Sequence, residues 1–324
     1  MARPDSAWQN WVPLCEAGGT CGSAGNRLFD GTDGEMRVCV GCGGVFPGPD
    51  WQCPICRFTP PCRHGYVSFA PDPSEETGGF RAAFFADLAK LEEKHFWFSS
   101  RNRLIAWAIQ SCFPTASSLL EIGTGTGVVL SNIKRVFPRL QLTASDVFTE
   151  ALDFARQRVP DVPLLQMDAR NIPFLEEFDL VGGFDLLEHI EEDEQVLRQM
   201  FRACKQGGGI LLTVPQHQLL WSALDDYSFH KRRFSRRELI RKVTAAGFNV
   251  LRITGFVSLF FPVLVVSRMR KRRMGPAFDP HAELTIPPRL NRVAGRVMDV
   301  ERRFIEMGVR FPFGGSLLLS AKRC

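Results

Sequence analysis

A glycine-rich stretch, SLLEIGTGTGVVL at residues 118–130, constrains the fold of this chain more than any other feature. An apolar run at 119–122 leads into glycines at 123, 125 and 127, and apolar residues resume at 128. This order predicts a strand, a tight turn and a helix, the arrangement in which backbone amides at a helix N-terminus bind a nucleotide. Two classes of nucleotide-binding fold begin this way, and they imply different chemistry.

Strand and helix patterns alternate after this glycine loop. Apolar runs predict strands at 118–122, 140–145, 164–166, 178–184 and 209–214. Helical periodicity predicts helices at 80–94, 101–112, 128–136, 150–158, 193–205 and 236–246. Such alternation favours an α/β fold, a doubly wound parallel sheet with helices on both faces. An aromatic cluster, HFWF at 95–98, is expected between the first two helices, either as core packing or as part of a lid.

The cysteines gather near the N-terminus, where seven of the ten lie within the first 62 residues. Two C-x-x-C pairs stand close together: Cys39 with Cys42, and Cys53 with Cys56. Each pair can hold a metal ion from a tight knuckle, and four thiolates complete a tetrahedral site with no open position. The spacing therefore predicts a structural zinc ribbon. The other N-terminal candidates are spaced irregularly, and we expect them to be unligated: Cys15, Cys21, Cys62 and His64.

Composition divides the chain into three parts. Residues 1–68 form the predicted ribbon region, residues 69–79 are rich in Pro, Gly and acids and resemble a linker, and residues 80–324 form the main domain. The N-terminus lacks the long apolar core of a signal peptide, and no window reaches the roughly 18 apolar residues of a membrane span. These features favour a cytoplasmic location.

Carboxylates follow consecutive predicted strands. Glu121 precedes the glycine loop, and further acids follow the second, third and fourth strands: Asp146, Asp168 and Asp185. Dinucleotide sites carry G-x-G-x-x-G, whereas here Val128 stands where the third glycine would be. The whole set resembles the class I S-adenosylmethionine-dependent methyltransferases, over about residues 95–324.

The resemblance implies a fold and a cofactor site. The fold would be a seven-stranded sheet with an antiparallel last strand. The last two strands would lie at residues 248–256 and 315–323, and a basic and apolar insertion at about 257–314 would separate them. By the resemblance, Asp146 would bind the cofactor ribose, and FDLLEHI, which contains Asp185, would lie beside the sulfonium. Two groups complete the cofactor site: the loop residues Glu121, Gly123, Gly125 and Gly127 near the amino acid part, and Asp168 with the Ala169 backbone near the adenine.

Methyl transfer from a sulfonium is an in-line displacement, so the protein chiefly positions the acceptor. A hydroxyl acceptor also needs a base. His189 follows the fourth strand within EHI, which resembles quinone-type O-methyltransferases, and His217 follows the fifth. Further candidates are Asp225, His230 and Arg233. Acids at 188 and 191–193 suggest a divalent metal, but acids at a helix start more often interact with its dipole.

The last third of the chain is strongly basic, because residues 228–324 carry 21 Lys and Arg against 6 Asp and Glu. Within it, 255–267 is apolar with Pro262 in its middle, and RMRKRRM follows. Residues 289–308 predict a basic amphipathic helix whose apolar face holds Leu290, Val293, Val297, Val300 and Ile305. Two interpretations stay open: contact with an anionic membrane surface, or a lid buried against the main domain.

These patterns favour a methyltransferase that acts on a small-molecule or lipid-linked acceptor, with O-methylation preferred. The alternative is methylation of ribosomal RNA bases, in which the ribbon and the basic third would bind RNA. Many base-amine methyltransferases carry N/D-P-P-Y/F after the fourth strand, where this chain has FDLLEHI instead. A non-enzymatic scaffold is disfavoured by the intact set of glycines and acids.

Overall fold

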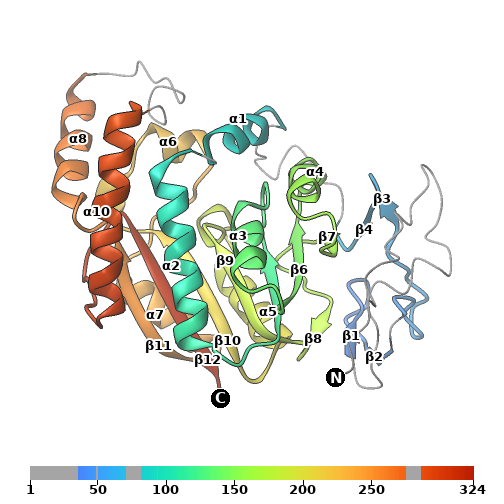
Figure 1. Ribbon diagram of the computed structural model, residues 1–324. Helices are drawn as coiled ribbons and strands as arrows, with labels where there is room; N and C mark the ends of the chain where they lie inside the picture. The colour runs from blue at the N-terminus through green and yellow to red at the C-terminus, as the bar shows by residue number, and fades with distance from the viewer. Residues whose placement is uncertain (1–35, 49, 71–81, 93, 275–285) are drawn as a thin grey trace, which may run out of the picture.

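The computed structural model describes residues 36–48, 50–70, 82–92, 94–274 and 286–324. A nine-stranded sheet runs through the molecule with helices on both faces, and a three-stranded sheet lies at one end (Figure 1). The order of the large sheet is β11-β12-β10-β9-β5-β6-β7-β4-β3. The expected linker falls mostly outside the described residues.

The seven strands expected from the sequence form the body of this sheet. They are β5 (Ser118–Ile122), β6 (Gln141–Asp146), β7 (Leu164–Gln166), β9 (Phe178–Phe184), β10 (Cys204–Pro215), β11 (Phe248–Phe256) and β12 (Ser316–Arg323). The first five pair in parallel, whereas β12 is antiparallel to both β10 and β11. The doubly wound sheet with an antiparallel last strand is thus confirmed.

Helices cover both faces of the sheet, and each face has its own apolar core. One core contains side chains of α2 (Phe96–Cys112), α3 (Val128–Val136), α4 (Thr149–Arg158) and α10 (Pro288–Glu306). The other contains side chains of α5 (Asp193–Ala203) and α7 (Arg236–Ala245). Three further helices are α1 (Ala82–Glu92), α6 (Ala223–Tyr227) and α8 (Phe261–Met274).

Several boundaries differ from the sequence expectation. The aromatic cluster does not separate two helices: Phe96 begins α2, and the His95 ring accepts a hydrogen bond from the Trp97 amide at 3.2 Å. The apolar segment at 255–267 is likewise divided, because β11 extends to Phe256 and α8 begins at Phe261. Pro262 therefore lies in the first turn of α8, where a proline costs no helical hydrogen bond.

The N-terminal region is joined to the main domain by strand pairing. β1 (Met36–Val38) pairs with β2 (Val45–Pro47) and also with β8 (Phe174–Leu175) of the main domain. β4 (Tyr66–Ser68) pairs in parallel with β7, and β3 (Cys62–Arg63) pairs with β4. Two strands that the sequence assigns to the ribbon region thus extend the main sheet.

Arg37 is the central side chain of this junction. Its side chain is fully buried, forms an ion pair with Glu177 and stacks 4.5 Å from the ring centroid of Trp51. Trp51 in turn makes an edge contact with Phe174, which belongs to β8. A buried guanidinium therefore connects the ribbon to the main domain through charge and aromatic contact.

We predict that Arg37→Ala costs about 3–5 kcal/mol of unfolding free energy, because it leaves the Glu177 carboxylate nearly buried without its cation. Thermal unfolding of the full chain measures this. Arg139→Ala, which removes an exposed arginine of the main domain, is the matched control. Equal midpoints for the two variants would show that the junction contributes no stability.

Candidate functional site

A cavity of about 970 Å³ lies beyond the carboxyl ends of the parallel strands. Its walls come from the ends of β5, β6, β7 and β9, and residues of α1 and α2 cover it. Most of the predicted site residues line it: Glu121, Gly123, Gly125, Asp146, Asp168, Ala169, Asp185 and His189. Gly127 and His217 are not among the lining residues. One cavity therefore brings together acids that are far apart in the sequence.

The glycine loop needs glycine for three different local reasons. Gly123, Gly125 and Gly127 all have positive φ, at 69°, 54° and 77°. A Cβ at Gly127 would lie 2.8 Å from the Cα of Ala155, so this glycine permits α4 to approach. A Cβ at Gly123 would meet Leu186, whereas nothing lies within 4 Å of one at Gly125. The middle glycine therefore opens onto the cavity.

Two buried carboxylates flank this loop. Asp146 at the end of β6 accepts hydrogen bonds from the amides of Gly125 at 2.8 Å and Phe148 at 3.0 Å. Glu121 is 1% exposed, and its Oε2 has no hydrogen-bond partner among the described residues. Burial raises the pKa of Glu121 to about 8 and that of Asp146 to about 6. Both acids are suited to accept hydrogen bonds from a polar ligand.

The third acid has a different environment. Asp168 follows β7 and forms an ion pair with Arg170 at 2.8 Å. Arg170 also contacts Glu192 at 3.3 Å. The Arg170 guanidinium therefore donates hydrogen bonds to both oxygens of the Asp168 carboxylate. The neighbouring Ala169 also lines the cavity.

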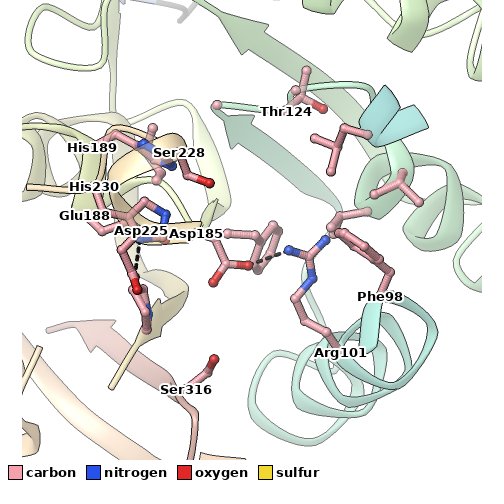
Figure 2. A pocket seen from close by; sticks show the side chains of 18 of the residues that line it. Phe98, Arg101, Thr124, Asp185, Glu188, His189, Asp225, Ser228, His230 and Ser316 are labelled. Atoms are coloured by element: carbon pink, nitrogen blue, oxygen red, sulfur yellow. Dashed lines mark hydrogen bonds and ion pairs between the residues drawn. The ribbon is translucent and has the colours of Figure 1, made fainter. Parts of the chain in front are cut away.

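An ion pair that the sequence did not suggest crosses the cavity. Arg101 of α2 points to Asp185 at the end of β9 and forms an ion pair with it (Figure 2). The guanidinium also lies 4.7 Å from the ring centroid of Trp97. Asp185 itself has a positive φ of 54°. The pair fixes α2 against the end of β9, so the aromatic start of α2 becomes a wall of the cavity.

A second cluster lies at the end of the cavity away from the glycine loop. Glu188, His189 and His230 approach one another there, together with Asp225 (Figure 2). Burial, followed by the influence of His230, lowers the pKa of His189 to about 3, so its imidazole is neutral. Burial also raises the pKa of Glu188 well above its ordinary value. Of the other acids that suggested a metal, Asp193 pairs with Arg232 and Lys242 instead.

His230 is oriented by a buried carboxylate. Its Nδ1 lies 2.8 Å from Asp225 Oδ1, and Arg233 contacts the same carboxylate at 2.8 Å. Although burial raises the pKa of Asp225, the His230 hydrogen bond and the Arg233 charge lower it to about 2. An ionised Asp225 only accepts hydrogen bonds, so Nδ1 carries the proton of a neutral His230 ring and Nε2 is the acceptor.

His217 lies elsewhere. It has a positive φ of 64°, and its ring centroid lies 5.2 Å from that of Phe261 in α8. Its place is thus beside the insertion. A catalytic role for His217 stays a prediction.

The predicted ribbon cysteines converge. Cys39 Sγ lies 3.5 Å from Cys56 Sγ, and Cys42 Sγ lies 3.7 Å from Cys53 Sγ. Four sulfurs bound to one zinc ion at about 2.3 Å would lie about 3.8 Å apart, so the donor set fits the ion. Cys62 is disulfide-bonded, so its sulfur is no thiolate ligand of a second metal site. Cys15 and Cys21 lie outside the described residues.

Comparisons with known proteins agree with this geometry. Residues 90–253, about half of the chain, match a family described as a methyltransferase domain. Demethylmenaquinone methyltransferase of Thermotoga maritima is 25% identical over 168 residues, which cover 50% of this chain and 72% of that protein. Phosphatidylethanolamine N-methyltransferase of Cereibacter sphaeroides is 35% identical over 101 residues, which cover 29% of this chain and 48% of that protein. The chain thus spans about half the length of the second relative.

A solved structure shows the same fold. The Haloferax volcanii complex of the Trm112 methyltransferase activator with a methyltransferase aligns with a TM-score of 0.51 and 17% identity. The alignment covers 74% of this chain and 94% of that chain.

Glu121 should make stability depend on pH. Between about pH 4.5 and pH 8, folded protein holds a proton on Glu121 that the unfolded chain releases, so stability falls as pH rises through this window. We predict that Glu121→Gln removes this loss and is more stable than wild type at pH 9, by up to roughly 5 kcal/mol. Thermal unfolding from pH 5 to 9 measures the difference, with Glu191→Gln as the exposed control. A constant difference across this range would contradict the raised pKa.

Proposed function

The chain belongs to the class I S-adenosylmethionine-dependent methyltransferases, and we propose that it methylates a hydroxyl group of a small-molecule or lipid-linked acceptor. The cavity is the observation that supports this proposal. At about 970 Å³ it lies at the upper end of the roughly 300–1,000 Å³ range of ligand pockets. It extends from the glycine loop to the Glu188 cluster, so a donor and an acceptor can share it.

The glycine-loop end fits the cofactor. Gly125 opens onto the cavity, and the buried carboxylates of Glu121 and Asp146 face the same space. When bound, the cofactor supplies an activated methyl group on a positively charged sulfur. We propose that Asp146 accepts hydrogen bonds from the ribose hydroxyls, and that Glu121 binds near the amino acid part. Asp168 and the Ala169 backbone are proposed to border the adenine, and Asp185 to lie beside the sulfonium.

The opposite end fits a small acceptor. Trp97, Phe98 and Leu224 are among the apolar side chains that line the cavity as a whole. The cluster of Glu188, His189 and His230 provides the polar groups that can activate a hydroxyl. Because burial keeps His189 neutral, its imidazole can serve as a hydrogen-bond acceptor or as a ligand at this end of the cavity.

RNA methylation has less support. If the ribbon and the basic C-terminal third both bound the same RNA, the two elements would have to lie on one face of the molecule. The N-terminal region pairs with β7 of the large sheet and with β8 of the small sheet, whereas α8 and α10 lie at the β11–β12 end of the large sheet (Figure 1). The width of the sheet therefore separates the two elements.

A labelled-donor experiment tests the proposal. Incubation of the protein with radiolabelled S-adenosylmethionine and a cell extract should place label in the lipid or small-molecule fraction. Asp146→Asn should weaken donor binding at least about tenfold in calorimetry, because charged acceptors of hydrogen bonds contribute about 1.5–3 kcal/mol each. Asp161→Asn, on the exposed surface, is the control. Label found in RNA alone would refute the proposed acceptor class.

We also propose that the insertion contacts an anionic membrane surface. α10 has two apolar rows, and its buried row contains Ala294, Met298 and Ile305. The second row is between 42% and 71% exposed and follows helical spacing: Leu290, Val293, Val300, Phe304 and Met307. Exposed arginines border it: Arg289, Arg292, Arg296 and Arg303. An apolar row with a basic border suits the boundary between acyl chains and anionic headgroups.

α8 belongs to the same surface. Its Val263 and Met269 are 64% and 56% exposed. Buried Glu301 of α10 accepts hydrogen bonds from the amides of Ser258 and Leu259, just before α8, at 2.7 and 2.8 Å. No described helix is both long enough and apolar enough to cross a bilayer.

Vesicle binding provides the test. Wild type should co-sediment with vesicles that contain anionic lipid, and added salt should weaken this binding. We predict that Leu290→Glu combined with Val293→Glu lowers binding at least tenfold, because each buried side chain contributes roughly 1.5 kcal/mol or more. Val136→Glu, at an exposed apolar position of α3, is the control. Equal binding by both variants would exclude α10 as the contact surface.

A further inference from the structure

The cluster of Glu188, His189 and His230 has the composition of a metal site. Each residue can offer one ligand atom, and these atoms lie within 4.8 Å of one another. Glu188 and His189 belong to the turn after β9, whereas His230 belongs to the loop before α7 (Figure 2). The amide of Lys231 donates to the Glu188 carbonyl at 2.6 Å and holds the two segments together. The fold thus brings the three ligands to one point.

Glu188 is the acid of this cluster without a neutralising cation. Its side chain is 1% exposed, and neither carboxylate oxygen has a hydrogen-bond partner among the described residues. The neighbouring acids differ, since Asp185 pairs with Arg101 and Asp225 with Arg233. An ionised carboxylate buried without compensation costs several kcal/mol. A cation bound beside Glu188 would offset the cost of ionising it.

His230 is oriented as metal-binding histidines usually are. Its Nδ1 donates to Asp225 at 2.8 Å, which leaves Nε2 free to bind an ion. A carboxylate is one of the groups that usually accept the second ring N–H of a metal-binding histidine. Asp225 also accepts a hydrogen bond from the Ser222 amide at 2.8 Å, and it forms an ion pair with Arg233. Asp225 therefore acts as a positioning residue.

We propose that Glu188, His189 and His230 bind a divalent transition-metal ion at the acceptor end of the cavity. Two imidazoles and one carboxylate suit ions such as zinc, iron, cobalt or manganese. Three protein ligands leave further positions open, as in catalytic sites, whereas the four ribbon thiolates form a closed site. Atoms bound to one ion at about 2.1 Å would lie about 3–3.4 Å apart, so the side chains would rotate toward the ion from separations of at most 4.8 Å.

The ion would explain how the acceptor is activated, an inference that rests on the proposed function. An acceptor hydroxyl that binds the open position has a lowered pKa and releases its proton to water. Its oxygen then forms a bond to the methyl carbon while the carbon–sulfur bond breaks. The electron pair of that bond stays on sulfur, which becomes a neutral thioether. Glu188, His189 and His230 would thus hold the reacting oxygen through the ion.

Cobalt titration of the full chain, with the ribbon already saturated with zinc, tests this site. We expect wild type to bind one additional Co²⁺ per chain, with the weak visible absorption of nitrogen and oxygen ligands and no sulfur-to-cobalt charge-transfer band. Glu188→Gln and His230→Asn should each weaken this binding at least about tenfold. Asp161→Asn changes an exposed acid that does not line the cavity and should bind Co²⁺ as wild type does.

Calorimetry with S-adenosylhomocysteine separates this inference from the proposed function. Variants that keep this binding but lose the additional Co²⁺ would support the metal site. The inference is overturned if wild type binds no Co²⁺ beyond the ribbon, or if Asp161→Asn weakens binding as much as Glu188→Gln does. Absence of S-adenosylhomocysteine binding in wild type would instead contradict the proposed function. His230→Asn provides an independent result if Glu188→Gln does not fold.

Discussion

The cavity holds more buried carboxyl groups than the described residues pair with cations. Arginines pair with Asp185 and Asp225, whereas the nearly buried Glu121, Asp146 and Glu188 form no ion pair with a described residue. Burial raises the pKa of all three acids. The arrangement favours ligands that bring positive charge or hydrogen-bond donors. A sulfonium cofactor at one end and the inferred metal ion at the other would satisfy this requirement together.

Much of the sheet and the cofactor end could be predicted from local pattern. The bounds of β5 and β9 match the expected ranges, because both strands are apolar runs buried along most of their length. The acids at the strand ends follow from the same topology, since parallel strands end at one edge. Arg101 could not be found this way, because a single arginine on a helix normally points to solvent. Its partner, Asp185, is 84 residues further along the chain.

The acceptor end was less predictable because loops determine it. His189 and His217 both follow central strands, yet the backbone turn at His217 directs its ring to Phe261. His230 takes the place beside His189, with a ring separation of 4.8 Å, because Asp225 and Arg233 hold its loop. The face of α10 shows a similar limit. The expected face grouped Ile305 with Val293, but the structure buries the first and exposes the second. Helical periodicity identifies which residues of α10 form the apolar side of the helix. It does not tell which of them pack against the main domain and which face solvent.

The ribbon and the main domain share backbone hydrogen bonds at two places, through β1 with β8 and through β4 with β7. The N-terminal region is therefore no detachable module. A chain shortened to begin at α1 would leave the outer edge of β7 without its neighbour and would expose the face of Phe174 that Trp51 covers. Bare strand edges are templates for pairing with other chains. A chain shortened in this way would therefore be prone to self-association.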